Sequence, residues 1–407
     1  MFKKLTAFAL VSVMLFTLAG CAPPPPPAPA APPAAPAAPA APAAPAAPAD
    51  AADPADEDGG WVIGIMTGTI TQNEEEYLAA SNMQARFGDD RIIRTTYPAN
   101  FGAEIEVVIS NMVALADQGA QAIIVCQAVP GVITAIQEIR DRFGDDFLFF
   151  AGTTHEPPPE VAQFVDVAIN SDDLLMGRII IEQAVRMGAD TFAHMSFPRH
   201  LGMVNIAARR EILMHYAEVH GLEWVELTFP DPMSEGVPVA QMFIVENVPR
   251  WVEEHGQNTA FFSTNCGVQE PLITQLVAYG GLYPLQCCPS PFHALPAAMN
   301  VDLEGREGDV PFLIDQLTLA FAEADATGRF STWPVPVNMA VIEIGVLYAI
   351  EYLEGRTDGR FDEAVLMQVA RDVGASFGAE LNFNNWPAEG GGYIENFFMM
   401  SSSFVTF

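Results

Sequence analysis

Lysine is almost absent from this chain of 407 residues, since Lys3 and Lys4 are the only two. Asp and Glu together number 51 against 18 Lys and Arg, which gives a formal net charge of −33. Proteins bind nucleic acid largely by neutralising phosphates with Lys and Arg, and they bind anionic membranes through polybasic segments. The composition therefore excludes both kinds of partner, and we interpret the acidity as an aid to solubility.

No catalytic arrangement stands out. The sequence contains no HExxH or CxxC pattern, and the Thr67-Gly68-Thr69 turn is neither GxGxxG nor a P-loop. The seven histidines are scattered along the chain. We therefore expect no enzyme activity, no cofactor and no metal.

Long apolar runs are scarce, and the first one carries a sorting signal. Lys3 and Lys4 precede an apolar run from Leu5 to Leu18, which is shorter than the roughly 20 residues that span a bilayer. Leu18-Ala19-Gly20-Cys21 then resembles a bacterial lipobox. This resemblance implies that residues 1–20 are a signal peptide and that Cys21 is lipidated and anchors the chain to a membrane. The alternative is an ordinary cleaved signal with a chance cysteine.

Residues 21–60 are dominated by Ala and Pro and end in an acidic patch before Gly59-Gly60. Proline fixes φ and lacks an N–H, and such a segment cannot bury enough apolar surface to fold. We expect a disordered, extended tether that holds a folded domain away from the membrane, in an extracytoplasmic location in the cell envelope.

After residue 60, short apolar runs alternate with amphipathic stretches, which predicts βαβ units and parallel sheets. The alternation stops near residue 170 and then begins again, so we expect an α/β protein with two similar lobes. An N-terminal lobe would cover 61–170 with the return of part of 300–407, and a C-terminal lobe 171–300. Residues 301–407 would form the crossover and C-terminal helices, and the tail from Ser376 has no clear pattern.

Particular boundaries follow from this pattern. We predict strands over Trp61–Met66, Phe164–Ile169 and Leu282–Gln286, and one long helix from about Leu201 to His220. Glu74, Glu75 and Glu76 begin a predicted helix, where acidic side chains suit the helix dipole, so we assign them a structural role.

Polar residues collect where the predicted strands end. In open α/β sheets ligands bind at the carboxyl ends of the strands, so these residues are candidates for binding a small polar molecule. The alternative is that they only cap helices and form turns. The candidate ligand-binding residues are Thr67, Gly68, Thr69, Tyr97, Gln127, Thr153, Thr154, Ser196, Arg199, Thr264, Asn265 and Cys266.

The strand and helix that begin at Phe164 are similar to the type I periplasmic binding protein and LacI-like superfamily. The similarity lies in a strand ending at Asn170-Ser171-Asp172, in Gly177 a few residues into the next helix, and in Gly188 at its end. It implies two α/β lobes, each a parallel sheet flanked by helices, with a ligand cleft between them. Asn170 and Asp172 would lie at the hinge.

A narrower resemblance is carried by Ile63–Thr69, Thr96–Phe101 and Gln127–Gly131, which are similar to a bacterial lipoprotein family of unknown function within this superfamily. The resemblance implies the fold and a role in uptake or sensing, and it supplies no ligand. We predict a monomeric, lipid-anchored solute-binding protein. It would capture a sugar, nucleoside or signalling molecule by lobe closure and deliver it to the membrane permease of an ABC importer. The alternatives are a receptor lipoprotein that senses ligand for a signalling partner and, less favoured, an envelope enzyme.

The cysteines leave several chemistries open. Cys266 and Cys287-Cys288 each follow a predicted strand, so they are expected to meet at the edge of one sheet. A disulfide among Cys126, Cys266, Cys287 and Cys288, free buried thiols and a thiol or metal site all remain possible, because four cysteines allow three full pairings.

Overall fold

The computed structural model describes residues 60–70, 72–306 and 308–407, which all belong to one compact unit. The predicted signal peptide, the lipidated Cys21 and the Ala/Pro tether lie outside the described residues. Within the described residues, no helix has both the length and the apolar character needed to cross a membrane.

The first sheet has seven strands in the order β10-β11-β5-β4-β3-β1-β2. All neighbours are parallel except β10, which runs antiparallel to β11. Four of the parallel strands are buried along their whole length, because helices cover both faces of the sheet. The strands are β1 (Ile63–Thr67), β2 (Ile92–Thr96), β3 (Ala122–Cys126), β4 (Leu148–Gly152), β5 (Val167–Ser171), β10 (Asn382–Pro387) and β11 (Tyr393–Ser401).

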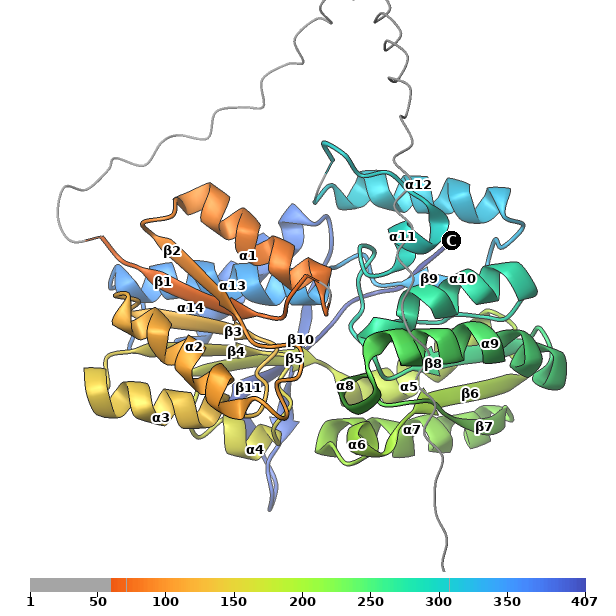
Figure 1. Ribbon diagram of the computed structural model, residues 1–407, viewed down its shortest axis with the longest axis horizontal. Helices are drawn as coiled ribbons and strands as arrows, with labels where there is room; N and C mark the ends of the chain where they lie inside the picture. The colour runs from red at the N-terminus through yellow and green to blue at the C-terminus, as the bar shows by residue number, and fades with distance from the viewer. Residues whose placement is uncertain (1–59, 71, 307) are drawn as a thin grey trace, which may run out of the picture. The chain divides into compact units, whose positions relative to one another are not determined.

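Helices cover this sheet in two layers (Figure 1). On one face the apolar side chains of three helices share a core with the sheet: α1 (Glu74–Phe87), α13 (Val337–Leu353) and α14 (Glu363–Ser376). On the other face α2 (Ile105–Asp117) and α3 (Val132–Phe143) form a separate core. Short α4 (Pro158–Val161) precedes β5. We call this sheet with its helices the first lobe.

The second lobe is built on a smaller parallel sheet in the order β7-β6-β8. Helices α5 and α7 pack on one face, and α9, α10 and α12 pack on the other. The strands are β6 (Thr191–Ser196), β7 (Glu223–Thr228) and β8 (Thr259–Ser263). The helices are α5 (Asp173–Arg186), α6 (Pro198–Leu201), α7 (Val204–His220), α8 (Pro232–Glu235), α9 (Val237–His255), η1 (Cys266–Val268), α10 (Gln269–Tyr279), α11 (Leu295–Met299) and α12 (Val310–Glu323).

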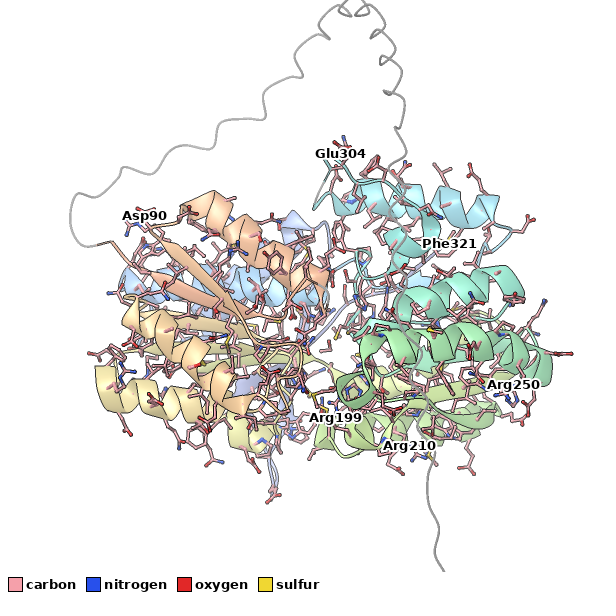
Figure 2. The ribbon with its side chains drawn as sticks, in the orientation of Figure 1. Asp90, Arg199, Arg210, Arg250, Glu304 and Phe321 are labelled. Carbon is pink, nitrogen blue, oxygen red and sulfur yellow. The ribbon has the colours of Figure 1, made fainter. Side chains whose placement is uncertain are left out.

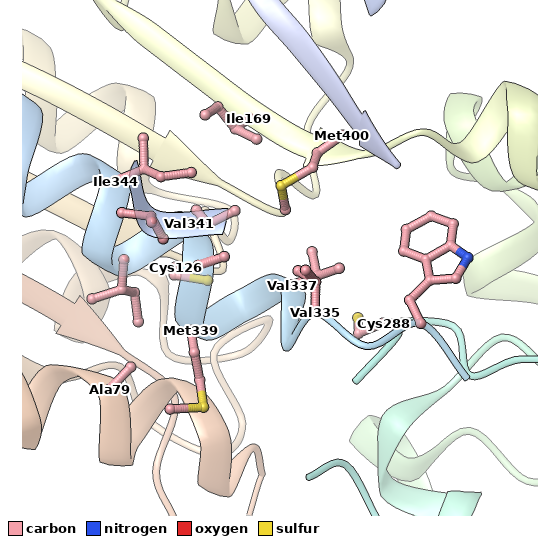
Figure 3. Packing of buried hydrophobic residues seen from close by; sticks show 14 of the residues in the cluster. Ala79, Cys126, Ile169, Cys288, Val335, Val337, Met339, Val341, Ile344 and Met400 are labelled. Atoms are coloured by element: carbon pink, nitrogen blue, oxygen red, sulfur yellow. The ribbon is translucent and has the colours of Figure 1, made fainter. Parts of the chain in front are cut away.

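Three segments connect the lobes. The chain passes from β5 into α5, returns from β9 (Ser331–Thr332) into α13, and leaves β11 toward β12 (Val405–Thr406). Strands β9 and β12 pair antiparallel, which ties two of these segments together. Figure 3 shows Val335 and Val337 of the second segment with Cys288 and Met400, in a core that continues from one lobe to the other.

The fold confirms the predicted two-lobed α/β architecture, and four of the expected elements differ. The strand expected over Trp61–Met66 covers Ile63–Thr67. Residues 282–286 form no strand and make only isolated bridges, since Pro284 cannot donate to a ladder. The helix expected from Leu201 begins at Val204, because Leu201 is the last residue of α6 and Gly202 is its C-cap. The strand expected from Phe164 begins at Val167, and the unassigned tail supplies β10 and β11.

Gly177 of α5 lies against Arg209 and Ile212 of α7. A Cβ atom there would lie 2.7 Å from Ile212 Cβ and 3.0 Å from the carbonyl oxygen of Arg209. We expect Gly177→Ala to force the helices apart and lower the free energy of unfolding by about 1–3 kcal/mol, as overpacking does. Gly202→Ala is the control, since its Cβ would meet no atom closer than 3.3 Å. Urea unfolding of both variants measures this, and equal stabilities would contradict the role of Gly177.

Candidate functional site

A cavity of about 630 Å³ opens between the lobes. Its wall takes residues that follow β2, β3, β4 and β5 of the first lobe and residues that follow β6, β7 and β8 of the second. These positions are the carboxyl ends of the parallel strands, where open α/β sheets bind ligands. The volume falls in the range of small-molecule sites.

Eight of the twelve predicted ligand-binding residues line this cavity. The first lobe supplies four of them and the second lobe the other four. They are Tyr97, Gln127, Thr153, Thr154, Arg199, Thr264, Asn265 and Cys266.

The other four predicted residues lie outside the cavity lining. The Thr67 hydroxyl donates to the carbonyl oxygen of Gly68, and the Gly68 N–H donates to Glu76 Oε1 over 2.7 Å. Thr69 is bonded to Gln72 of its own turn. Ser196 is 1 % exposed and its hydroxyl is held by Thr264 at 2.8 Å. Their polar groups are bonded within the protein, and the structure does not bring them to the cavity wall.

The two predicted hinge residues have different surroundings. Asn170 lines the cavity, and its side chain accepts from the Thr154 N–H and donates to the Thr154 hydroxyl. Asp172 is outside the lining, where it caps α5 by accepting from the Leu175 N–H and binds Asn384 of β10. Both lie where β5 joins α5, in the first of the three segments that connect the lobes. A rotation of one lobe against the other would change the backbone angles of this segment.

The two arginines of the cavity wall are each paired. Arg199, labelled between the lobes in Figure 2, donates twice to Asp231, at 2.8 and 2.9 Å. Arg209 donates to Asp173, and both side chains are less than one-tenth exposed. The positive charges of both arginines are therefore balanced by carboxylates of the second lobe.

Two histidines of the wall are neutral at pH 7. Burial, assisted by the nearby charge of Arg199, lowers the pKa of His155 to about 4 and the pKa of His200 to about 3. The His155 Nε2 lies 2.7 Å from Gln127 Oε1, and its ring meets Phe101 edge-on. The cavity therefore presents imidazoles, amides, hydroxyls and an aromatic wall, and the exposed Glu235 is the one charged side chain among its described lining residues that is in no ion pair.

Two carboxyl groups of α1 are buried beside the cavity. Burial raises the pKa of Glu75 and of Glu76 to about 8, so both hold a proton at neutral pH. Glu76 is bonded to the Gly68 N–H and to the hydroxyl of Tyr97, and Glu75 accepts from Ser290 of the second lobe. The helix begins at Glu74, as predicted from these acids, and the two buried carboxyl groups also connect elements distant in sequence.

Three cysteines meet at the cavity wall, as the sequence suggested. The Sγ atoms of Cys266, Cys287 and Cys288 all lie within 4.8 Å of one another, and those of Cys266 and Cys287 are 3.2 Å apart. All four described cysteines are free thiols. The hydrogen bonds of the Cys266 and Cys288 thiols to Cys287 lower the pKa of Cys287 well below its usual value.

Several residues of the cavity wall are not among the predicted ligand-binding residues. Asp173, His200, Asn205 and Arg209 lie on helices rather than at strand ends. They reach the cavity because α5, α6 and α7 start beside it. The only sequence signal was the position of Asp173 and His200 just after a predicted strand or crossover.

Solved structures share this fold of two α/β lobes with a cavity between them. A putative transcriptional regulator from Clostridium difficile 630 superposes with a TM-score of 0.67 at 20% identity, over 85% of this chain and 99% of that one. A substrate-binding protein of a sugar ABC transport system from Bordetella parapertussis 12822 gives 0.51 at 12% identity, over 85% and 89%.

The chain belongs to the family described as "Protein of unknown function (DUF3798)", whose model matches residues 61–331. It is similar to two uncharacterized proteins of Treponema pallidum (strain Nichols). One is 36% identical over 174 residues, which cover 42% of this chain and 80% of the relative. The other is 31% identical over 177 residues, with the same coverage.

Proposed function

We propose that this chain is a lipid-anchored, extracytoplasmic solute-binding protein that captures an uncharged polar small molecule and delivers it to the permease of an ABC importer. The observation that carries the proposal is the cavity at the strand ends of both lobes, whose two arginines are paired inside the protein and whose histidines are neutral. A sugar or nucleoside offers the hydroxyl groups and ring face that such a wall accommodates.

Lobe closure provides the mechanism. Ligand that contacts both walls favours the closed arrangement, because only there can it bond to both lobes at once. Asn170 and Asp172 lie where the first connecting segment would flex. The lipobox-like Leu18–Cys21 and the Ala/Pro segment support a membrane tether for the domain, and the solute-binding relative with the same fold supports an import role.

Ligand binding is tested by native mass spectrometry of the full chain isolated gently from its own cells. A stoichiometric small-molecule adduct that is released on denaturation is expected, and the released molecule should be uncharged and polar. With that ligand, Gln127→Ala and Asn265→Ala should each weaken affinity by up to about tenfold, the worth of one neutral hydrogen bond.

Gln163→Ala and Asn247→Ala are matched controls, since both amides lie outside the cavity lining and bond to nearby backbone. Their affinities should equal that of the unaltered chain. An apo mass together with no thermal stabilisation by a panel of sugars and nucleosides would contradict the proposal.

A further inference from the structure

The cavity wall contains a cluster of three thiols. The proposed binding of a polar small molecule uses hydroxyl and amide groups and gives these thiols no role. Cys266 begins η1 directly after β8, and Cys287 and Cys288 lie in the loop that follows residue 286. All three line the cavity. The cluster is therefore both preformed inside the second lobe and reachable from the space between the lobes.

We propose that Cys266, Cys287 and Cys288 form a three-sulfur binding site for a single thiophilic d10 cation such as Zn²⁺ or Cu⁺. This inference goes beyond the proposed import function and does not depend on it.

The spacing of the sulfur atoms suits one ion. A Zn–S bond is about 2.3 Å, so three sulfurs around one ion lie roughly 3.8–4.0 Å apart. The three Sγ atoms already lie within 4.8 Å of one another, so ligation requires side-chain rotations rather than a movement of the backbone. Thiolate sulfur is the donor that selects soft ions over Mg²⁺ or Ca²⁺.

Surrounding hydrogen bonds hold the site in place. The Gln269 amide donates to Cys287 Sγ at 3.5 Å, and it is fixed in turn by the carbonyl oxygens of Ser263 and Asn265. The Gln269 side-chain oxygen accepts from Tyr283, a side chain that is fully buried. An amide N–H directed at a sulfur ligand is the kind of outer interaction that orients metal-binding thiolates.

The loop that carries two of the thiols is equally well anchored. The Gln286 amide donates to the carbonyl oxygens of Ser290 and His293, and its side-chain oxygen accepts from Thr332. Because Cys287 directly follows this anchored residue, its position is set before any ion binds.

Three protein ligands leave a tetrahedral ion with one free position. Since all three cysteines line the cavity, that position faces the space where a ligand would bind. Binding requires thiolates, so each thiol that ligates the ion releases its proton to solvent.

Titration of the reduced full chain carrying Cys21→Ser with Cd²⁺, followed by ultraviolet absorption, tests the proposal. One equivalent of Cd²⁺ should produce a sulfur-to-metal charge-transfer band, and native mass spectrometry should show one Zn²⁺ per chain. Cys266→Ser and Cys288→Ser should each weaken Cd²⁺ binding by more than the about 10- to 100-fold that loss of an outer-shell partner causes.

Cys126→Ser is the matched control, because Cys126 is a buried free thiol of the first lobe whose sulfur bonds to Glu76. It should bind Cd²⁺ as the unaltered chain does, and circular dichroism checks that every variant is folded. Absence of the band in folded, reduced protein would overturn the proposal, as would a band that survives in Cys266→Ser and Cys288→Ser. A disulfide between Cys266 and Cys287 in protein freshly isolated from its own cells would also overturn it.

Discussion

Asp173→Ala should lower the free energy of unfolding by about 3–5 kcal/mol, because it leaves a buried guanidinium without its counter-ion. Asp173 accepts from Arg209 and from Asn205, and the Arg209 side chain is only 3% exposed. The Arg209 Cζ also lies 5.0 Å from the centre of the Phe262 ring, so the charge cannot move to solvent without disturbing the core. Chemical denaturation of the purified variant measures the loss.

Asp117→Ala is the matched control, since Asp117 pairs with Arg142 at a site where both side chains are at least two-fifths exposed. Exposed pairs contribute at most about 1 kcal/mol, so its effect should be small. The double variant Asp173→Ala/Arg209→Met removes the orphaned charge and should recover much of the loss. A stability of Asp173→Ala equal to that of Asp117→Ala would refute the assignment of a buried pair.

The free energy of unfolding should fall between about pH 7 and pH 8, where most small proteins show little change. Burial raises the pKa of Glu75 and Glu76 to about 8, so the folded state keeps protons that the unfolded chain has released. This stabilisation is complete below the unfolded pKa of about 4.5 and is lost as the pH rises through 8, by up to about 1.4 kcal/mol per pH unit for each carboxyl.

Other titratable groups also make the free energy of unfolding depend on pH, and their effects add to those of Glu75 and Glu76. The lowered pKa values of His155 and His200 act in the opposite sense, since their stabilisation is lost as the pH falls below about 6.5. Burial raises the pKa of Glu156 and of Glu343 only to about 7. The lowered pKa of the Cys287 thiol also acts in the opposite sense, because the unfolded chain keeps that proton until the pH nears 9. The contribution of Glu75 and Glu76 is therefore measured as the difference in slope between variants.

Urea unfolding at a series of pH values separates the two carboxyls. Glu76→Gln should remove a loss of up to about 1.4 kcal/mol per pH unit from the slope between pH 7 and 8, and the double change to Gln at 75 and 76 should remove about twice as much. Glu74→Gln, at an exposed position one residue earlier, should leave the slope unchanged. A slope that is the same in all four proteins would show that the buried acids are ionised when folded.

Much of the fold was predictable because its strands are short apolar runs between helical segments. Ile63–Thr67 and Ala122–Cys126 are buried on both faces, so burial and local preference agree. The residues 282–286 look similar in composition, and they fail as a strand because Pro284 interrupts the ladder. Strands β10 and β11 were missed because β11 is placed by a partner far away in sequence, β5.

Residues of the cavity wall could be predicted from the sequence only where they directly follow a strand. Tyr97, Gln127 and Asn265 follow strands and reach the cavity, as expected from the parallel-sheet rule. Glu75 and Glu76 obey the same local rule as any acidic helix start, and only the tertiary cover from the Ser290 loop and α13 turns them into buried, protonated acids. No local pattern carries that information.

The parallel pairing of β11 with β5 also sets an order of events during synthesis. Phe397 pairs with Ala168, and Met400 with Ser171, so the first sheet waits for residues that leave the ribosome long after its other strands. The second sheet draws its strands from residues 191–263 alone and can close earlier. Such long-range pairings form slowly and leave an unpaired strand edge in the meantime. The nascent first lobe is therefore the part of this chain most in need of protection from aggregation.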